Sequence, residues 1–147
     1  MLSFFCILTA SVRLERCQKP SLVETQTFDI TPNYFCPMGN LTLNIRAKVP
    51  SNVTNVFSEL RFETRGIPRM RYLIDYCGNG SKGCNSKNGI LKYTRRFPAP
   101  TRVVVNSSDK GYFNTPVTVR LIHHGTFDGE RVHVGCVNFT TKRQERC

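Results

Sequence analysis

The chain has 147 residues, a formal net charge of +11 at pH 7 and seven cysteines. This length suits one domain, and the cysteine content argues against a cytosolic protein, whose thiols stay reduced, and for a secreted one. The scattered positive charge favours an anionic partner such as a membrane or a sulfated glycan, although a solvated polar surface is the simpler reading. Secretion argues against nucleic acid, and the aromatic residues do not interleave with the basic ones as a base-stacking surface requires.

The first sixteen residues are predicted to be a signal peptide. Residues 2–12 are largely apolar and too short to cross a membrane as a helix, and small residues such as Ala10 precede a charged stretch. We expect cleavage between residues 10 and 16, and the alternative is a buried first strand. Cys6 would leave with this segment, so residues 17–147 would form a single domain with an even number of cysteines.

Apolar and polar residues alternate along most of the remaining chain, which predicts half-buried antiparallel strands. The predicted strands cover residues 41–49, 59–63, 69–75, 117–121 and 131–136, with weaker ones at 25–31, 89–93 and 101–105. Turn residues separate them, including Gly66-Ile67-Pro68 and the hairpin signal Asp128-Gly129. Seven or eight short strands without a convincing helix indicate an all-β sandwich or barrel.

Five Asn-x-Ser/Thr sequons fit a glycoprotein of the secretory pathway. Glycosylation is predicted at four of them: Asn40, Asn52, Asn79 and Asn106. The fifth, at Asn138, is the least favoured because it lies in an apolar, strand-like run. The alternative for each is an unmodified polar residue of a turn or strand.

Candidates for catalysis or metal binding are few. His123 and His133 could face each other across the hairpin, but two histidines without a nearby carboxylate or thiolate make a poor metal site, and the favoured interpretation is that they are ordinary strand residues. Glu59 and Glu63 alternate with arginines on a face predicted to be exposed, where ion pairing is their expected role. No nucleophile elbow or phosphate-binding loop occurs. The sequence therefore predicts no catalytic residue, no cofactor and no metal site.

Three features taken together resemble the ML (lipid-recognition) domain family, and within it most closely the ganglioside activator. They are Cys77-Gly-Asn-Gly-Ser-Lys-Gly-Cys84, Val134-Gly-Cys-Val137, and Pro37-Met-Gly-Asn-Leu-Thr-Leu43 at the start of the clearest strand. The resemblance implies an immunoglobulin-like β-sandwich or β-cup, stapled by disulfides, whose two sheets enclose an apolar cavity. It also implies the disulfides Cys17–Cys136 and Cys77–Cys84, and Cys36–Cys147 is paired by elimination outside the family pattern.

On this resemblance, the inward-facing residues of the predicted strands are candidates for the wall of a lipid cavity. They are Leu41, Leu43, Ile45, Leu60, Phe62, Met70, Tyr72, Ile74, Val117, Val119, Leu121, Val132 and Val134. The same residues suit a filled core. Between residues 85 and 115 the chain departs from the ganglioside activator, because it is shorter, basic and free of cysteine. Candidates for a membrane-facing rim are Tyr93, Arg95, Arg96, Phe97 and Arg102, and a solvated loop is the alternative.

The resemblance implies a secreted or lysosomal lipid-binding or lipid-transfer protein that is not an enzyme. It would hold the acyl chains of a glycolipid, phospholipid or fatty acid, work at an anionic membrane surface, and present the lipid to a glycosidase or a receptor. The alternative is a cationic secreted interaction protein, such as a venom, immune or signalling factor, that has the same scaffold and acts through its basic surface.

Overall fold

The computed structural model describes residues 14–17, 21–31, 34–35, 39–76, 89–98 and 116–143. Several sequence predictions fall outside these residues: most of the signal peptide, the strand at 101–105, Arg102, the sequons at Asn79 and Asn106, and the disulfides Cys77–Cys84 and Cys36–Cys147.

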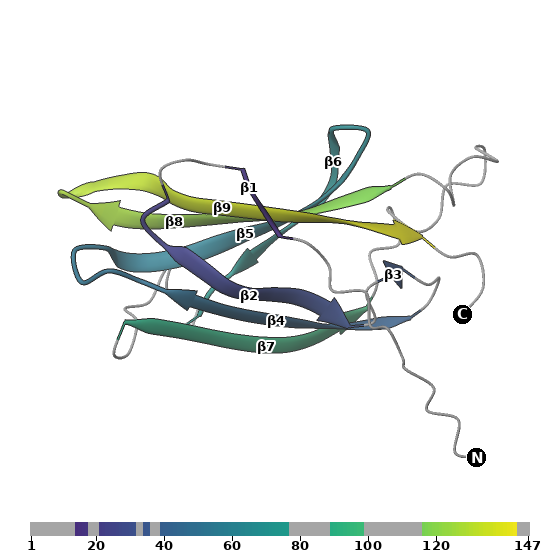
Figure 1. Cartoon of the computed structure of the whole chain (residues 1–147), viewed down its shortest axis with the longest axis horizontal. Coiled ribbons are helices and arrows are strands. Elements are labelled where there is room, and N and C mark those ends of the chain that lie inside the picture. Colours follow the sequence, from purple (N-terminus) through teal and green to yellow (C-terminus); the bar gives the residue numbers. More distant parts are fainter. Residues whose placement is uncertain are drawn as a thin grey trace, which may run out of the picture.

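Two antiparallel sheets face each other as the layers of a sandwich (Figure 1). The larger sheet has the strand order β1-β9-β8-β5-β6, and β3 pairs in parallel with the end of β9. Its strands are β1 (Glu15–Arg16), β3 (Tyr34–Phe35), β5 (Thr54–Thr64), β6 (Ile67–Ile74), β8 (Val117–Phe127) and β9 (Glu130–Arg143). The smaller sheet has the order β2-β4-β7, with β2 (Glu24–Thr31), β4 (Asn40–Lys48) and β7 (Ile90–Pro98). The predicted all-β sandwich is therefore confirmed.

Two tight hairpins organise the larger sheet. Asp128 and Gly129 join β8 to β9 with φ angles of 50° and 77°, the positive values of the turn predicted there. Arg65 and Gly66, at 53° and 74°, join β5 to β6 in the same way. The predicted turn at Gly66-Ile67-Pro68 was therefore placed too late, because Ile67 and Pro68 already belong to β6. Pro68 is tolerated there since β6 is an edge strand and the register shifts beside it.

Four strands run further than the alternation predicts: β5, β7, β8 and β9. In β5 the reason is local. The register against β8 shifts between Thr54 and Phe57, and Asn55 within this interval has a φ of 52°. An extra residue of this kind interrupts the alternation of buried and exposed side chains. The strand therefore continues through a segment in which the period of two is lost.

The space between the sheets holds two apolar clusters. The main cluster joins residues of both sheets, such as Leu41 and Ile45 of β4 with Phe62 and Val119 of the larger sheet. Its members, each at most 7% exposed, are Phe28, Ile30, Leu41, Leu43, Ile45, Leu60, Phe62, Ile74, Val117, Val119, Leu121, Val137 and Phe139. The end cluster consists of Val23, Ala47, Val49, Val53, Val56, Leu91 and Val134.

A close contact between backbones positions the start of β2 against β9. The amides of Leu22 and Val23 both donate to the Val134 carbonyl, at 2.9 and 2.8 Å. A Cβ atom on Gly135 would lie 2.9 Å from both the Val23 carbonyl oxygen and the Ser21 hydroxyl, so glycine is needed here. This contact holds the start of β2, in the smaller sheet, against β9 of the larger sheet.

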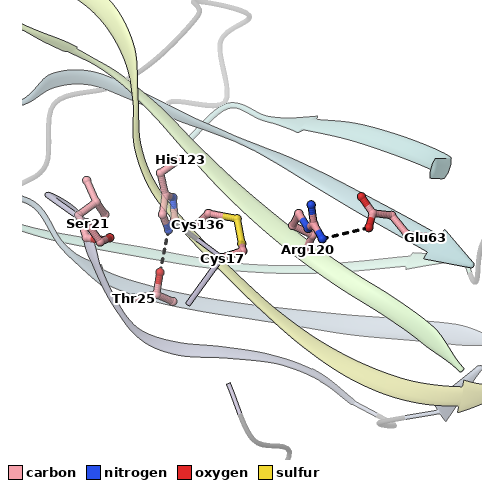
Figure 2. Close-up of a disulfide and its surroundings, with 8 residues drawn as sticks. Cys17, Ser21, Thr25, Glu63, Arg120, His123 and Cys136 are labelled. Atoms are coloured by element: carbon pink, nitrogen blue, oxygen red, sulfur yellow. Dashed lines mark hydrogen bonds and ion pairs between the residues drawn. A yellow bond between two sulfur atoms is a disulfide. The ribbon is translucent and has the colours of Figure 1, made fainter. Parts of the chain in front are cut away.

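The outer face of the larger sheet carries buried carboxylates. Glu59 and Glu63 are only 4% and 6% exposed, so the prediction of an exposed face was wrong, because arginine side chains from neighbouring strands cover them. The predicted ion pairs do form: Glu59 accepts hydrogen bonds from Arg61, at 2.7 Å, and from Arg71, and Glu63 pairs with Arg120 at 3.3 Å (Figure 2). Burial raises the pKa of Glu59, but the two arginines outweigh it and lower the pKa to about 2.

The Cys17–Cys136 disulfide connects the short strand β1 to the middle of β9, as the family resemblance implied (Figure 2). The Cys17 amide also donates to the Cys136 carbonyl at 3.1 Å. Leu14 packs against the main cluster, and Glu15 and Arg16 pair with β9. Signal cleavage before Leu14 would preserve this strand, whereas cleavage at the end of the predicted interval would remove it.

Candidate functional site

An apolar pocket lies at one edge of the sandwich, between β6 of the larger sheet and β7 of the smaller one. In the described residues these two strands are not paired with each other. The pocket has a volume of about 180 Å³ and is lined by Leu43, Leu60, Tyr72, Leu73, Ile74, Tyr93, Arg95, Phe97 and Pro98. Leu43, Leu60 and Ile74 also belong to the main cluster, so the pocket opens from the core itself.

Aromatic side chains from both sheets meet at this pocket. The rings of Tyr72, on β6, and Phe97, on β7, lie 5.8 Å apart, and both lie near Phe62, at 6.1 and 6.3 Å. Burial raises the pKa of the Tyr72 phenol. Because Tyr72 and Phe97 are only partly buried, their rotation would change the size of the pocket without disturbing a strand.

Some of the predicted cavity residues line the pocket, and most do not. Leu43, Leu60, Tyr72 and Ile74 line it. The others pack elsewhere: Leu41, Ile45, Phe62, Val117, Val119 and Leu121 within the main cluster, Met70 against it, Val134 within the end cluster, and Val132 against it.

The predicted rim divides between the two faces of β7. Tyr93, Arg95 and Phe97 line the pocket. Arg96 follows the opposite alternation and is paired with Thr42 on β4. Leu73 and Pro98 were not predicted as pocket residues. Leu73 is 70% exposed. The sequence gives one indication of its role, because an apolar residue stands here at a polar position of the alternation formed by Met70, Tyr72 and Ile74.

A chain of polar side chains lies inside the sandwich, and the sequence did not predict it. Ser58 of β5 contacts both the Tyr76 hydroxyl and His123 Nδ1 at 2.6 Å, and Thr25 of β2 contacts His123 Nε2 at 2.8 Å (Figure 2 shows the Thr25 contact). One order of donors satisfies all four groups: Tyr76 to Ser58, Ser58 to Nδ1, and Nε2–H to Thr25. Because Thr25 is in the smaller sheet, this polar chain links the two sheets.

The polar chain holds His123 in its neutral form. Burial, followed by the charge of His124, lowers the pKa of His123 to about 4. Burial also raises the pKa of the Tyr76 phenol, whose hydroxyl faces the interior although part of the ring stays exposed. Ser58 and His123 are both 0% exposed and cannot contact a substrate, so we assign this chain of polar side chains a structural role.

The predicted pairing of His123 with His133 was wrong. A register shift between His123 and His124 places His123 opposite Gly135 and His124 opposite His133. The rings of His124 and His133 lie 4.5 Å apart, and His124 Nε2 lies 3.6 Å from Glu59. Within the described ranges, no group of three or more His, Cys, Asp or Glu side chains is arranged to hold a metal ion.

Lowering the pH from 6.5 to 4 is expected to destabilise the protein. Because the folded pKa of His123 lies below the unfolded value of 6.5, its contribution is fully present above pH 6.5 and is lost as the pH falls to about 4. The loss is on the order of 3 kcal/mol. His124, whose pKa is also lowered, adds to the loss of stability over this range. The stabilisation by Glu59, whose pKa is lowered to about 2, is lost only as the pH falls below 4.5. Urea denaturation at pH 7, 5.5 and 4.5 measures the loss. A His123→Gln variant should show a flatter profile, and an equally steep profile in this variant would contradict the assignment.

These features define a class: an immunoglobulin-like β-sandwich with an apolar pocket at the unpaired edge between its sheets. None of the described segments forms a helix that could span a membrane. No protein-family model matches the sequence, and no curated protein matches it either.

Among solved structures, the chain is similar to a Niemann-Pick type C2 protein from the Japanese carpenter ant, with 13% identity, a TM-score of 0.53, and coverage of 90% of this chain and 99% of that one. It also matches the sporulation control protein Spo0M of Bacillus subtilis (7% identity, TM-score 0.43, 86% of this chain and 51% of that one). A third match is chicken MD-1 complexed with lipid IVa (18% identity, TM-score 0.36, 89% of this chain and 97% of that one). The first of these similarities confirms the fold that the resemblance implied, an immunoglobulin-like β-sandwich.

Proposed function

We propose that this protein binds a lipid without catalysis and holds part of an acyl chain in the pocket between β6 and β7. The observation that carries the proposal is the pocket itself, in which side chains of the apolar core, Leu43, Leu60 and Ile74, reach the unpaired edge of both sheets. Each CH₂ group that moves from water into such a site gains about 0.8 kcal/mol. The ML resemblance of the sequence implies the same class of ligand.

The size of the pocket limits what it holds without rearrangement. A volume of about 180 Å³ is close to that of an engineered apolar cavity of about 150 Å³ that binds benzene. It is smaller than the roughly 300–1,000 Å³ of usual ligand sites. A short segment of an acyl chain therefore fits. Binding of a full chain requires Tyr72 and Phe97 to rotate and open the space between the sheets.

Several features support a secretory location, outside cells or in lysosomes. Asn40 begins β4 and Asn52 lies in the turn between β4 and β5, and both are exposed, so both sequons are accessible to glycosylation. Asn138 is half-buried on β9 opposite Arg120, which agrees with its being the least favoured glycosylation site in the sequence. Presentation of a ganglioside to a glycosidase, or of a lipid to a receptor, is a further hypothesis based on the family resemblance alone.

Uptake of an uncharged apolar probe tests the proposal. We expect N-phenyl-1-naphthylamine to become fluorescent on binding and monoolein to displace it. Leu73→Ser should weaken monoolein binding by about fivefold, because it removes apolar surface at the pocket edge. Leu22→Ser, at a second exposed leucine that does not line the pocket, is the matched control and should leave affinity unchanged.

A protein that takes up neither the probe nor monoolein would overturn the proposal. That result would favour the alternative of a cationic interaction protein, which needs no pocket and should lose its partner at high salt.

A further inference from the structure

Arg95 occupies an unusual place on β7. Leu91, Tyr93, Arg95 and Phe97 alternate along one face of this strand and pair with Ala47, Ile45, Leu43 and Leu41 on β4; Arg95 is the exposed member of the row. Every other member of this double row is apolar or aromatic. Arg95 therefore places a charged group on the apolar side of the edge strand, and it lines the pocket.

Several arginines of the larger sheet have carboxylate partners, whereas Arg95 has none in the described part of the chain. Arg61 and Arg71 both bind Glu59, and Arg120 binds Glu63. No hydrogen bond or ion pair of Arg95 is found among the residues that the structure describes. A guanidinium stays protonated at any physiological pH and offers five N–H donors. The pocket edge therefore carries a permanent cation whose donors are not taken up by any residue that the structure describes.

The strands around the pocket add to the positive charge at its edge. β4, β6 and β7 contain no aspartate or glutamate. Their basic residues are Arg46, Lys48, Arg69, Arg71, Lys92, Arg95 and Arg96. Of these residues, Arg71 is paired with a carboxylate, that of Glu59 on β5. A surface of one sign attracts ligands of the opposite sign and raises their local concentration.

We propose that the ligand is an anionic amphiphile whose carboxylate or phosphate binds Arg95 while its acyl chain enters the pocket. This inference rests on the proposed function and adds the class of headgroup. An arginine can bind either anion through two parallel N–H···O bonds, and such charge-assisted bonds are roughly twice as strong as neutral ones. The chain would then lie on Leu43, Leu60 and Ile74, away from water.

Three ligands with the same oleoyl chain test the headgroup: monoolein, oleate and oleoyl lysophosphatidic acid. Each would displace N-phenyl-1-naphthylamine at pH 7.4 and low salt, below its critical micelle concentration. We expect the better of the two anions to bind about tenfold more tightly than monoolein. Arg95→Gln should abolish this preference, so that the variant binds the better anion no more tightly than it binds monoolein. The anion that loses more affinity identifies the headgroup as carboxylate or phosphate.

Two further variants make the test specific. Arg96→Gln removes the same charge from the neighbouring position, which faces the other side of β7, and should keep the preference. Arg95→Lys keeps the charge but loses the two-pronged geometry, so an intermediate preference is expected. A preference that survives Arg95→Gln, or its absence in the natural protein, would overturn the headgroup inference and leave acyl binding intact. Failure of all three ligands to bind would overturn both proposals.

Discussion

Replacing Cys17 and Cys136 together by serine is expected to lower the free energy of unfolding by about 4–5 kcal/mol. The disulfide joins residues 119 positions apart, so its loss raises the conformational entropy of most of the unfolded chain. For a chain of this length, the change corresponds to a fall in melting temperature of roughly 10–20 °C. Guanidinium denaturation and calorimetry without reductant measure both quantities.

The double variant is preferable to either single one, since a remaining thiol at Cys17 or Cys136 would exchange with other cysteines. Near-ultraviolet circular dichroism should show that the variant still packs its core at 25 °C. A loss below about 1 kcal/mol would mean that backbone pairing of β1 with β9 already holds the N-terminal segment in place, and that the entropic argument fails here.

His123→Ala is expected to destabilise the fold by about 3–5 kcal/mol at pH 7. The substitution leaves a cavity in the interior and removes the partner of Ser58 and Thr25, which lie on opposite sheets. Ser58 keeps its contact with Tyr76 but loses the acceptor for its own hydroxyl, and the half-buried Thr25 loses its partner on the other sheet. These losses together cost about 1–3 kcal/mol, and the lost ring adds a cavity term. Urea denaturation provides the measurement.

His133→Ala is the matched control, because His133 is exposed on the same sheet and contacts His124 only at its edge. Its cost should stay below about 1 kcal/mol. Equal effects of the two substitutions would show that the polar chain between the sheets does not contribute to stability. The size of the His123 effect thus measures how strongly this chain connects the two layers.

Alternation located seven of the nine strands that the structure describes, because a half-buried strand must place every second residue in the core. It left open whether the strands form a sandwich or a barrel. It failed at irregularities. At the register shift between His123 and His124, Val134 of β9 has no paired residue on β8, so His133 lies opposite His124 and not opposite His123. A bulge of this kind cannot be found from a period of two. Glu59 and Glu63 look exposed in the sequence because the arginines that cover them come partly from β6 and β8, far along the chain.

The distinction between core and pocket could not be predicted for a related reason. Leu41 and Leu43 are equivalent in the pattern of β4, yet only Leu43 lines the pocket. The difference depends on which strands form the edges of the two sheets, and that is a property of the topology. Leu73 was the one local clue, since an apolar residue on the polar side of an edge strand needs a reason to be there.

Among the residues that the structure describes, β6 and β7 are edge strands, and this bears on how the molecules behave at high concentration. An exposed strand edge offers free backbone donors and acceptors to any other chain, which is how sheets aggregate. Arginine and lysine side chains along both edges, with Pro68 at the start of β6, oppose such contacts by repulsion and by blocking pairing. The charges that we propose attract a ligand would therefore also keep copies of the protein apart, and an anionic ligand that neutralises them would bring the molecules closer to self-association.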